Sequence, residues 1–180
     1  IDIEIGNQQP VENVDSFVFN PHKWLLTNFD CSAFFVKDKE TLTKTFEIHP
    51  EYLKTGMDEI VNNYRDWGIQ LGRRFRALKL WFVLRSYGVE GLQSMVREHI
   101  SLAQKLKEWI EDDERFEIMA PVDFSLVCFR FNPKNLSENE LTELNKKLLD
   151  EVNKTGKTFL THTTLKGKYV IRFCIAQRTT

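Results

Sequence analysis

Two stretches of helical periodicity that meet at Gly88 constrain the fold more than any other feature of the chain. From Ile69 to Tyr87 one helical stripe is apolar, and most of the basic residues lie off it. The members of this stripe are Leu71, Phe75, Leu78 and Phe82. From Val89 to Asp112 apolar residues again recur at intervals of three and four, which predicts a second amphipathic helix. Its length suits a helix that bridges two domains.

Short strands and a loop are expected on the N-terminal side of these helices. The runs Asp15–Asn20 and Cys31–Lys37 are aromatic and β-branched, which is the composition of strands. The residues between them are too irregular for either kind of element. A short helix is predicted over Lys39–Phe46. The segment 47–68 has no clean period, and we interpret it as a lid.

After Asp113 the pattern changes to short strands and one helix. Strands are predicted over residues 116–119, 125–131, 158–162 and 169–175. Ser137 and Glu140 form a capping box at the start of the helix, and Gly156 ends it. The predicted inner stripe of this helix is Leu141, Leu144, Leu148 and Val152. This order predicts a small α+β domain with a mainly antiparallel sheet and a covering helix.

Composition narrows the classes of partner. Lys and Arg total 25 against 26 for Asp and Glu, so the net charge of −1 provides no field to attract nucleic acid or an anionic membrane. No apolar run approaches the roughly 20 residues that cross a bilayer. We therefore expect a cytoplasmic protein whose partner is a small molecule or another subunit. Because the chain opens at Ile1 within a polar stretch, we also expect it to be part of a longer protein.

The three cysteines predict no metal or redox site. Cys31, Cys128 and Cys174 are widely spaced, and no two of them form a C-x-x-C pair. Each lies in an apolar segment, which is typical of buried, reduced thiols.

Lys23 is the residue best suited to covalent chemistry. It follows Asn20 and Pro21, where the proline restricts the backbone, so its position is expected to be defined. A desolvated amine loses its charge more easily, and a neutral amine is what an aldehyde needs to form a Schiff base. On spacing alone, an ordinary surface lysine remains the alternative.

Several motifs around Lys23 and along the helices are more specific than composition. They are VDSFVFNPHKWLLTNFDCSAFFVKD and YRDWGIQLGRRFRALKLWFVLRSYGVEGLQ, followed by DERFEI, LVCFRFNP and IRFCI. Together they resemble the group II pyridoxal 5′-phosphate (PLP)-dependent amino-acid decarboxylases. The resemblance is strongest to the aromatic-L-amino-acid branch, which includes tyrosine, tryptophan and DOPA decarboxylases, and it covers nearly the whole chain from Val14 onward.

The resemblance implies an α/β protein of PLP fold type I, the aspartate-aminotransferase-like fold. Residues 1–88 would form the end of the large PLP-binding domain, with the cofactor lysine and the mobile loop. Residues 89–114 would form a bridging helix, and residues 115–180 a small C-terminal α+β domain.

The same resemblance implies site residues. Lys23 matches the lysine that holds PLP, and Asn20 matches an asparagine that contacts the cofactor phosphate. His22 lies next to the cofactor in the family, with a purely structural role as the alternative, and Trp24 is expected to pack. Tyr52 matches a mobile-loop tyrosine linked to protonation of the substrate Cα in the neighbouring subunit; a tyrosine packed on the surface is its alternative.

The implied activity is decarboxylation of an aromatic L-amino acid to the amine and carbon dioxide by a homodimeric lyase. Relatives with Phe at the position of Tyr52 tend to be aldehyde synthases that use oxygen, so Tyr52 favours simple decarboxylation. An aldehyde synthase, a decarboxylase for another amino acid and a degenerate, assembly-only domain remain alternatives. Because the acid that pairs with the pyridinium nitrogen and most of the pocket belong to the upstream part in this family, we expect this chain alone to be inactive.

Two further features modify this expectation. The cluster of Arg73, Arg74 and Arg76 is interpreted as structural ion pairs or a dimer contact rather than a nucleic-acid site. Asn63 and Gly68 stand where the family usually has Asp and Gln, which leaves loop closure and substrate preference open.

Overall fold

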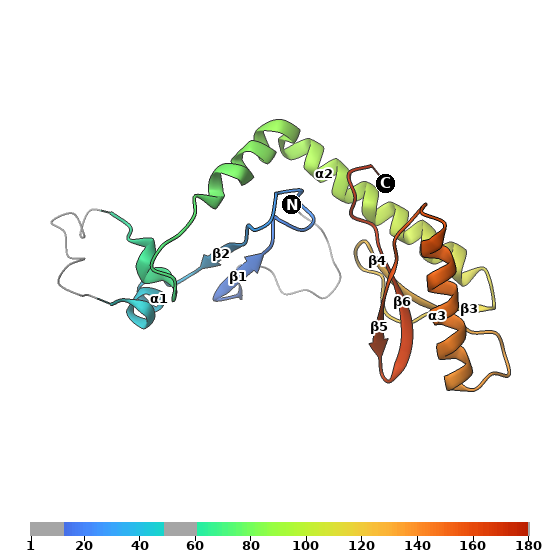
Figure 1. The fold of residues 1–180 in the computed structure, drawn as a ribbon. Coiled ribbons are helices and arrows are strands. Elements are labelled where there is room, and N and C mark those ends of the chain that lie inside the picture. The colour runs from blue at the N-terminus through green and yellow to red at the C-terminus, as the bar shows by residue number, and fades with distance from the viewer. Residues whose placement is uncertain (1–12, 49–60, 180) are drawn as a thin grey trace. The chain divides into compact units, whose positions relative to one another are not determined.

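The computed structural model describes residues 13–48 and 61–179, shown as a ribbon in Figure 1. Their contacts divide them between Gly88 and Val89 into two compact units. Within these two ranges no helix combines the length and the apolar character needed to cross a membrane. The roles assigned above to residues 1–88, 89–114 and 115–180 stay predictions.

The first unit contains a two-stranded antiparallel sheet, as predicted. Strands β1 (Ser16–Phe19) and β2 (Ala33–Val36) pair along their full length. The rings of Phe19 and Phe35 stack across the pair, with centroids 6.2 Å apart. Phe34 and Phe35 remain 46% and 58% exposed. The hairpin therefore brings the two ends of the loop 20–32 together while leaving aromatic surface uncovered.

Helix α1 (Lys39–Phe46) has the predicted bounds, and its start has a local cause. The carboxylate of Asp38 accepts hydrogen bonds from the backbone N–H groups of Glu40 and Thr41 at 3.0 and 3.1 Å, which is an N-cap. A 3₁₀ helix, η3 (Tyr64–Trp67), packs against α1 within the segment that was interpreted as a lid. The middle of that segment, including Tyr52, lies outside the described residues.

Helix α2 (Arg76–Glu111) differs from the prediction at its start. The predicted start at Ile69 is wrong. Gly68 and Gly72 disfavour a helix in this segment. The Arg73 side chain donates to the backbone oxygen of Tyr64 at 2.9 Å, which holds the segment in a different conformation. Gly88 interrupts α2 with φ 71° and ψ 164°, a conformation that side chains disfavour.

The apolar stripe predicted for the first helix is exposed. Leu71 and Phe75 precede α2, and Leu78 and Phe82 within it are 41% and 58% exposed. A helical stripe specifies a face to be covered but not the segment that covers it. The periodicity was therefore informative about the helix and not about its burial within this chain.

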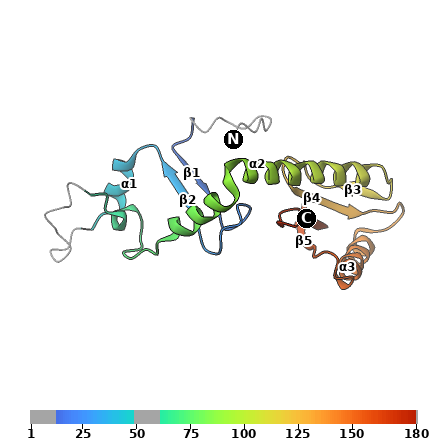
Figure 2. The same cartoon turned by 90° about the horizontal axis from the view of Figure 1, so that it is seen from above.

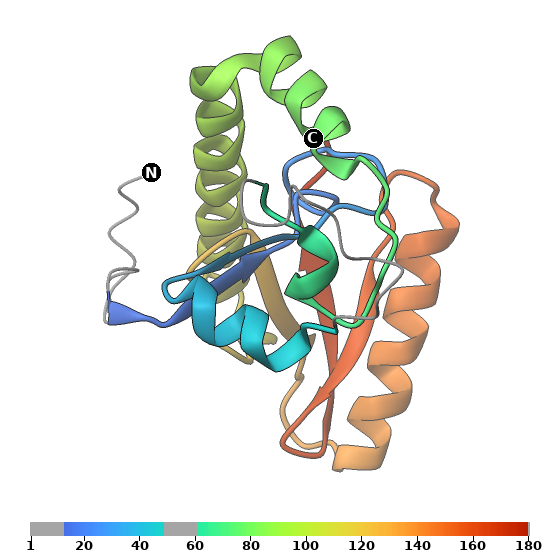
Figure 3. The same cartoon turned by 90° about the vertical axis from the view of Figure 1, so that its left-hand side faces the viewer.

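The second unit is built on a four-stranded antiparallel sheet in the order β3-β4-β6-β5. Its strands are β3 (Phe116–Ile118), β4 (Leu126–Phe131), β5 (Thr161–Leu165) and β6 (Lys168–Cys174). Strands β3 and β4 run beside the second part of α2 (Figure 2), and α3 (Glu138–Lys154) runs beside the β5–β6 hairpin (Figure 3). One core joins both helices to the sheet. Its buried members are Ala103, Ile110, Val122, Val127, Phe129, Leu149, Leu160, Ile171 and Ile175.

Strand β5 begins later than predicted. The prediction of 158–162 is wrong because the side chain of Asn153 binds both the N–H and the carbonyl of Leu160, at 2.7 and 3.0 Å. The turn then sets the register: Leu165 pairs with Lys168, and Lys166 and Gly167 between them have φ 51° and 78°. Positive φ at both central residues is the two-residue hairpin turn whose twist matches the strands.

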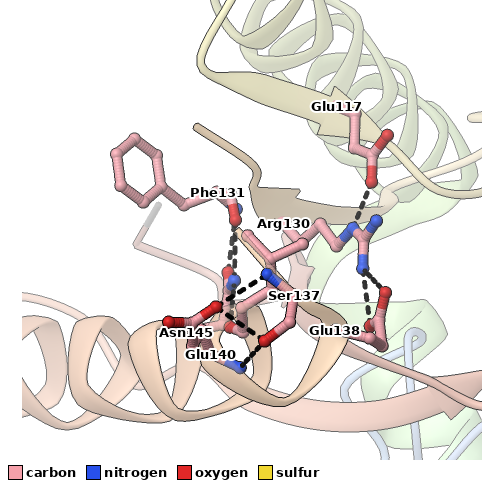
Figure 4. Close-up of polar contacts among 8 residues, drawn as sticks. Glu117, Arg130, Phe131, Ser137, Glu138, Glu140 and Asn145 are labelled. Carbon is pink, nitrogen blue, oxygen red and sulfur yellow. Dashed lines mark hydrogen bonds and ion pairs between the residues drawn. The ribbon is translucent and has the colours of Figure 1, made fainter. Parts of the chain in front are cut away.

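Helix α3 starts at the predicted capping box, but its inner face is partly polar. The Ser137 hydroxyl accepts from the Glu140 N–H, and the Glu140 carboxylate accepts from the Ser137 N–H at 2.8 Å. Asn145 is fully buried and was missed by the apolar stripe. Its side chain accepts from the Phe131 N–H at 2.8 Å and donates to the carbonyls of Phe131 and Leu141 at 2.7 and 2.8 Å (Figure 4). This amide ties the helix to the end of β4.

A buried guanidinium makes a second polar link between α3 and the sheet. The side chain of Arg130 is 4% exposed and pairs with Glu117 of β3 and with Glu138 in the first turn of α3 (Figure 4). Both Glu138 oxygens accept from it, at 2.8 and 3.0 Å. These carboxylates raise the pKa of Arg130 above its usual value even though burial opposes them, so the charge is compensated.

The predicted burial of the cysteines is confirmed for two of the three. Cys31 and Cys128 are buried, and all three cysteines are free thiols. Cys174, the last residue of β6, is exposed, so its predicted burial is wrong: an apolar neighbourhood in sequence does not decide which face of a strand a side chain occupies.

Candidate cofactor site

The loop 20–32 joins β1 to β2 and carries three of the predicted site residues. Asn20 follows β1 directly, and its carbonyl accepts from the Lys23 N–H at 2.9 Å, which closes a turn around Pro21. The carbonyl of Pro21, itself buried, accepts from the Thr27 N–H at 3.1 Å. These backbone contacts fix the Cα of Lys23 while its side chain stays exposed. The structure thus brings Asn20, His22 and Lys23 together on one loop.

His22 is anchored across the loop to Cys31. The His22 N–H donates to the Cys31 carbonyl at 3.2 Å, and the Cys31 N–H lies 3.0 Å from Nδ1 of the imidazole. Nδ1 also lies 2.7 Å from the Cys31 oxygen. In one tautomer Nδ1 accepts from the N–H, and in the other it donates to the carbonyl, so the ring is held in either case. The edge of the ring meets Phe29, with centroids 4.9 Å apart.

Asn20 has a defined amide orientation. Its Oδ1 accepts from the Ser32 hydroxyl at 2.6 Å, across the mouth of the loop. With the oxygen engaged, the NH₂ end is the part of the side chain that can donate to an anion. This arrangement fits the predicted contact between Asn20 and a cofactor phosphate.

Asp30 fastens the far side of the loop to the residues that open α2. Its Oδ1 accepts from Arg74 at 2.5 Å, and its Oδ2 accepts from Arg76 at 3.1 Å. The hydrogen bond from Arg76 is the main cause that holds the pKa of Asp30 below its usual value. Arg74 and Arg76 therefore form structural ion pairs, which is one of the two interpretations made from the sequence. Arg73 instead donates to the backbone oxygen of Tyr64, and both Arg73 and Arg74 precede the helix.

The chemical groups that the loop carries are suited to holding a PLP group. It offers a primary amine on a fixed backbone, an amide donor and an anchored imidazole. Tyr52, the fourth predicted site residue, lies outside the described residues, and the roles of all four stay predictions. The role of Asp30 was not predicted from the sequence; the available signal was a lone acid in a loop, with an arginine cluster further along the chain.

Residues 5–132 match the pyridoxal-dependent decarboxylase conserved domain. The chain belongs to this family. The predicted family and its pyridoxal cofactor are confirmed by this match, and the α/β fold class is confirmed by the likeness to solved structures of the family.

Two curated proteins and one solved structure of this family are similar to the chain over most of its length. Tyrosine decarboxylase 2 of Narcissus pseudonarcissus and phenylacetaldehyde synthase of Arabidopsis thaliana are each 50% identical to it over 167 residues, which is 92% of this chain and 33% and 34% of theirs. The crystal structure of Oryza sativa TDC with PLP and tryptamine superimposes with a TM-score of 0.84 at 40% identity, covering 92% of this chain and 35% of that one. The chain thus spans about a third of the length of the relatives it matches.

Proposed function

We propose that the protein containing this chain is a PLP-dependent carboxy-lyase that converts an aromatic L-amino acid to its amine and carbon dioxide. The observation that carries the proposal is the match to the pyridoxal-dependent decarboxylase domain across residues 5–132, which includes the Lys23 loop. The relatives named for tyrosine decarboxylation and for a complex with tryptamine support an aromatic substrate.

In this proposal each residue of the loop has a distinct task. PLP, when bound, accepts the electron pair released as carbon dioxide leaves the substrate. Lys23 would supply the amine that holds the cofactor. Asn20 would donate to the phosphate through its NH₂ group, because its Oδ1 already accepts from Ser32. His22, anchored to Cys31, limits where the cofactor can lie.

Tyr52 completes the proposed mechanism. Its phenol delivers a proton to the substrate Cα, which a phenylalanine cannot do. Following the family resemblance, Tyr52 acts in the active site of the neighbouring subunit, so the enzyme is a homodimer. The balanced charge of the chain supports an enzyme that binds neither nucleic acid nor an anionic membrane, and its widely spaced cysteines fit a reducing cytoplasm.

The test uses the full-length protein with tyrosine, DOPA, tryptophan and phenylalanine as substrates. We expect amine and carbon dioxide from at least one of them, and a visible absorption band after addition of PLP. Borohydride reduction followed by mass spectrometry should place the cofactor on Lys23. Lys23→Ala should abolish the band and the activity, while Lys37→Ala, which removes another exposed lysine near the same hairpin, should retain both. A cofactor attached to another lysine, or no band in the wild type, contradicts the proposal and favours an assembly-only protein.

An aldehyde synthase is the second candidate because the Arabidopsis thaliana synthase is as similar to this chain as the tyrosine decarboxylase is. The products separate the two reactions: a synthase releases aldehyde, ammonia and peroxide instead of the amine. We expect amine from the wild type and a shift toward aldehyde in Tyr52→Phe. Aldehyde from the wild type would reject the decarboxylase in favour of the synthase.

A further inference from the structure

We infer that Asp30 is a positioning residue for Lys23, acting by clamping the loop 20–32 to the residues that open α2. The inference rests on the proposed role of Lys23 and concerns how that lysine is held. Asp30 is not among the site residues predicted from the sequence, which are Asn20, His22, Lys23 and Tyr52.

Both oxygens of Asp30 accept hydrogen bonds, each from a different arginine. Arg74 binds Oδ1 at 2.5 Å, and Arg76 binds Oδ2 through Nε and Nη2, both at 3.1 Å. Charge-assisted contacts to two donors at separate oxygens restrict both the position and the rotation of the carboxylate. The arginines come 44 and 46 residues after Asp30, so the contact fastens the loop to a distant part of the same unit.

Asp30 is connected to Lys23 through a short series of contacts and peptide bonds. Cys31 is joined to Asp30 by one planar peptide unit, and His22 is joined to Lys23 by another. Between these two pairs lie the contacts of His22 with Cys31, at 3.2 Å between backbones and 3.0 Å to the ring. The Sγ of Cys31 also lies 3.9 Å from the Arg76 carbonyl, so Cys31 contacts the same arginine residue that binds Asp30. A shift of Asp30 therefore displaces Cys31, then His22, then the backbone of Lys23.

The exposure of the ion-paired side chains indicates that they position the loop rather than stabilise the whole protein. The side chains of Asp30 and Arg76 are 30% and 26% exposed, and that of Arg74 is 71% exposed. Ion pairs with this much solvent contribute little to the stability of a whole protein. Their effect should be local, on the geometry of the loop. Misplacement of a catalytic group by about 1 Å can cost about 100-fold in rate, so a local effect is sufficient to matter.

The experiment compares Asp30→Asn and Asp30→Glu in the full-length protein with Asp113→Asn as the matched control. Asp113 also binds an arginine, Arg115 at 2.7 Å, but it lies in the second unit. We expect Asp30→Asn to lower kcat by about 10- to 100-fold, with a smaller change in KM, and to speed cofactor release. Asp30→Glu, which keeps the charge, should recover part of the loss of kcat, and Asp113→Asn should keep the wild-type kcat and KM. Arg74→Gln, which leaves the Arg76 contact, should shift kcat in the same direction by less.

A readout that needs no cofactor keeps this inference separate from the proposed function. Hydrogen–deuterium exchange in the PLP-free protein should be faster at the His22 and Cys31 amides in Asp30→Asn, while the melting temperature stays near that of Asp113→Asn. Unchanged exchange and kcat would overturn the inference and leave the decarboxylase proposal intact. A melting temperature that falls for the whole protein would also overturn it, because Asp30 would then be a general stability residue. Faster loop exchange in a protein that never holds PLP on Lys23 would support the clamp and reject the proposed function.

Discussion

Replacing Asn145 with leucine should destabilise the second unit, because leucine has the same branched shape and number of heavy side-chain atoms but offers no hydrogen bond. The substitution removes three contacts and leaves the Phe131 N–H and carbonyl without the partner that the buried amide provides. The exchange therefore isolates the polar contribution of the side chain from the effect of a cavity.

The magnitude follows from the groups left behind. Each buried backbone group without a partner costs about 1–3 kcal/mol, so the two at Phe131 cost roughly 2–6 kcal/mol. Phe131 is only half-buried, so some water reaches it and the lower end applies. Additional apolar burial by leucine returns about 1 kcal/mol. We expect a net loss of about 1–3 kcal/mol in the free energy of unfolding.

Calorimetry of the full-length protein checks this value, through the transition that includes the second unit. The control is Lys146→Ala, at the next position of α3, which removes only a surface pair with Glu143 and should change stability by less than about 0.5 kcal/mol. If the two variants unfold at the same temperature, the hydrogen bonds of Asn145 provide no net stability and the reasoning fails.

Three further predictions concern the backbone, pH and the isolated chain. Gly88→Ala should destabilise by about 1–3 kcal/mol, because φ 71° with ψ 164° is a glycine conformation; thermal unfolding that matches the wild type would refute this. Hydrogen bonds from Arg115 lower the pKa of Asp113 to about 2, so its contribution is present above the ordinary value of 3.8 and is lost as the pH falls toward 2. The difference in melting temperature between wild type and Asp113→Asn should therefore shrink over that window, and a constant difference would exclude the linkage. The 180-residue chain alone should release no amine from aromatic amino acids in the presence of PLP, and robust turnover would contradict this.

The sequence was sufficient where a feature has a local cause. The capping box of Ser137 and Glu140 and the short helix over Lys39–Phe46 were predicted with the correct starts. Both depend on contacts between residues within one turn. The Lys23 loop was likewise found, because its motif is contiguous in the chain.

Features that depend on distant segments were missed. Asn145 has its partner on β4, and the start of β5 depends on Asn153 of α3, which no local period reveals. The clamp between Asp30 and Arg76 spans 46 residues. The stripe ending at Phe82 is exposed here, and the relatives are about three times as long as this chain, so a periodicity within the chain cannot say what covers it.

The hairpin of β1 and β2 has a practical consequence for handling this chain. A two-stranded sheet is marginally stable by itself, and this one carries Phe17, Phe34 and Phe35 at 42%, 46% and 58% exposure. Among the residues that the structure describes, this sheet has only these two strands, so each has an outer edge beside those rings, and such an edge templates strand addition between molecules. Expressed by itself, the chain is expected to aggregate through this hairpin, and substituting charged residues at Phe34 or Phe35 is the direct way to keep it in solution.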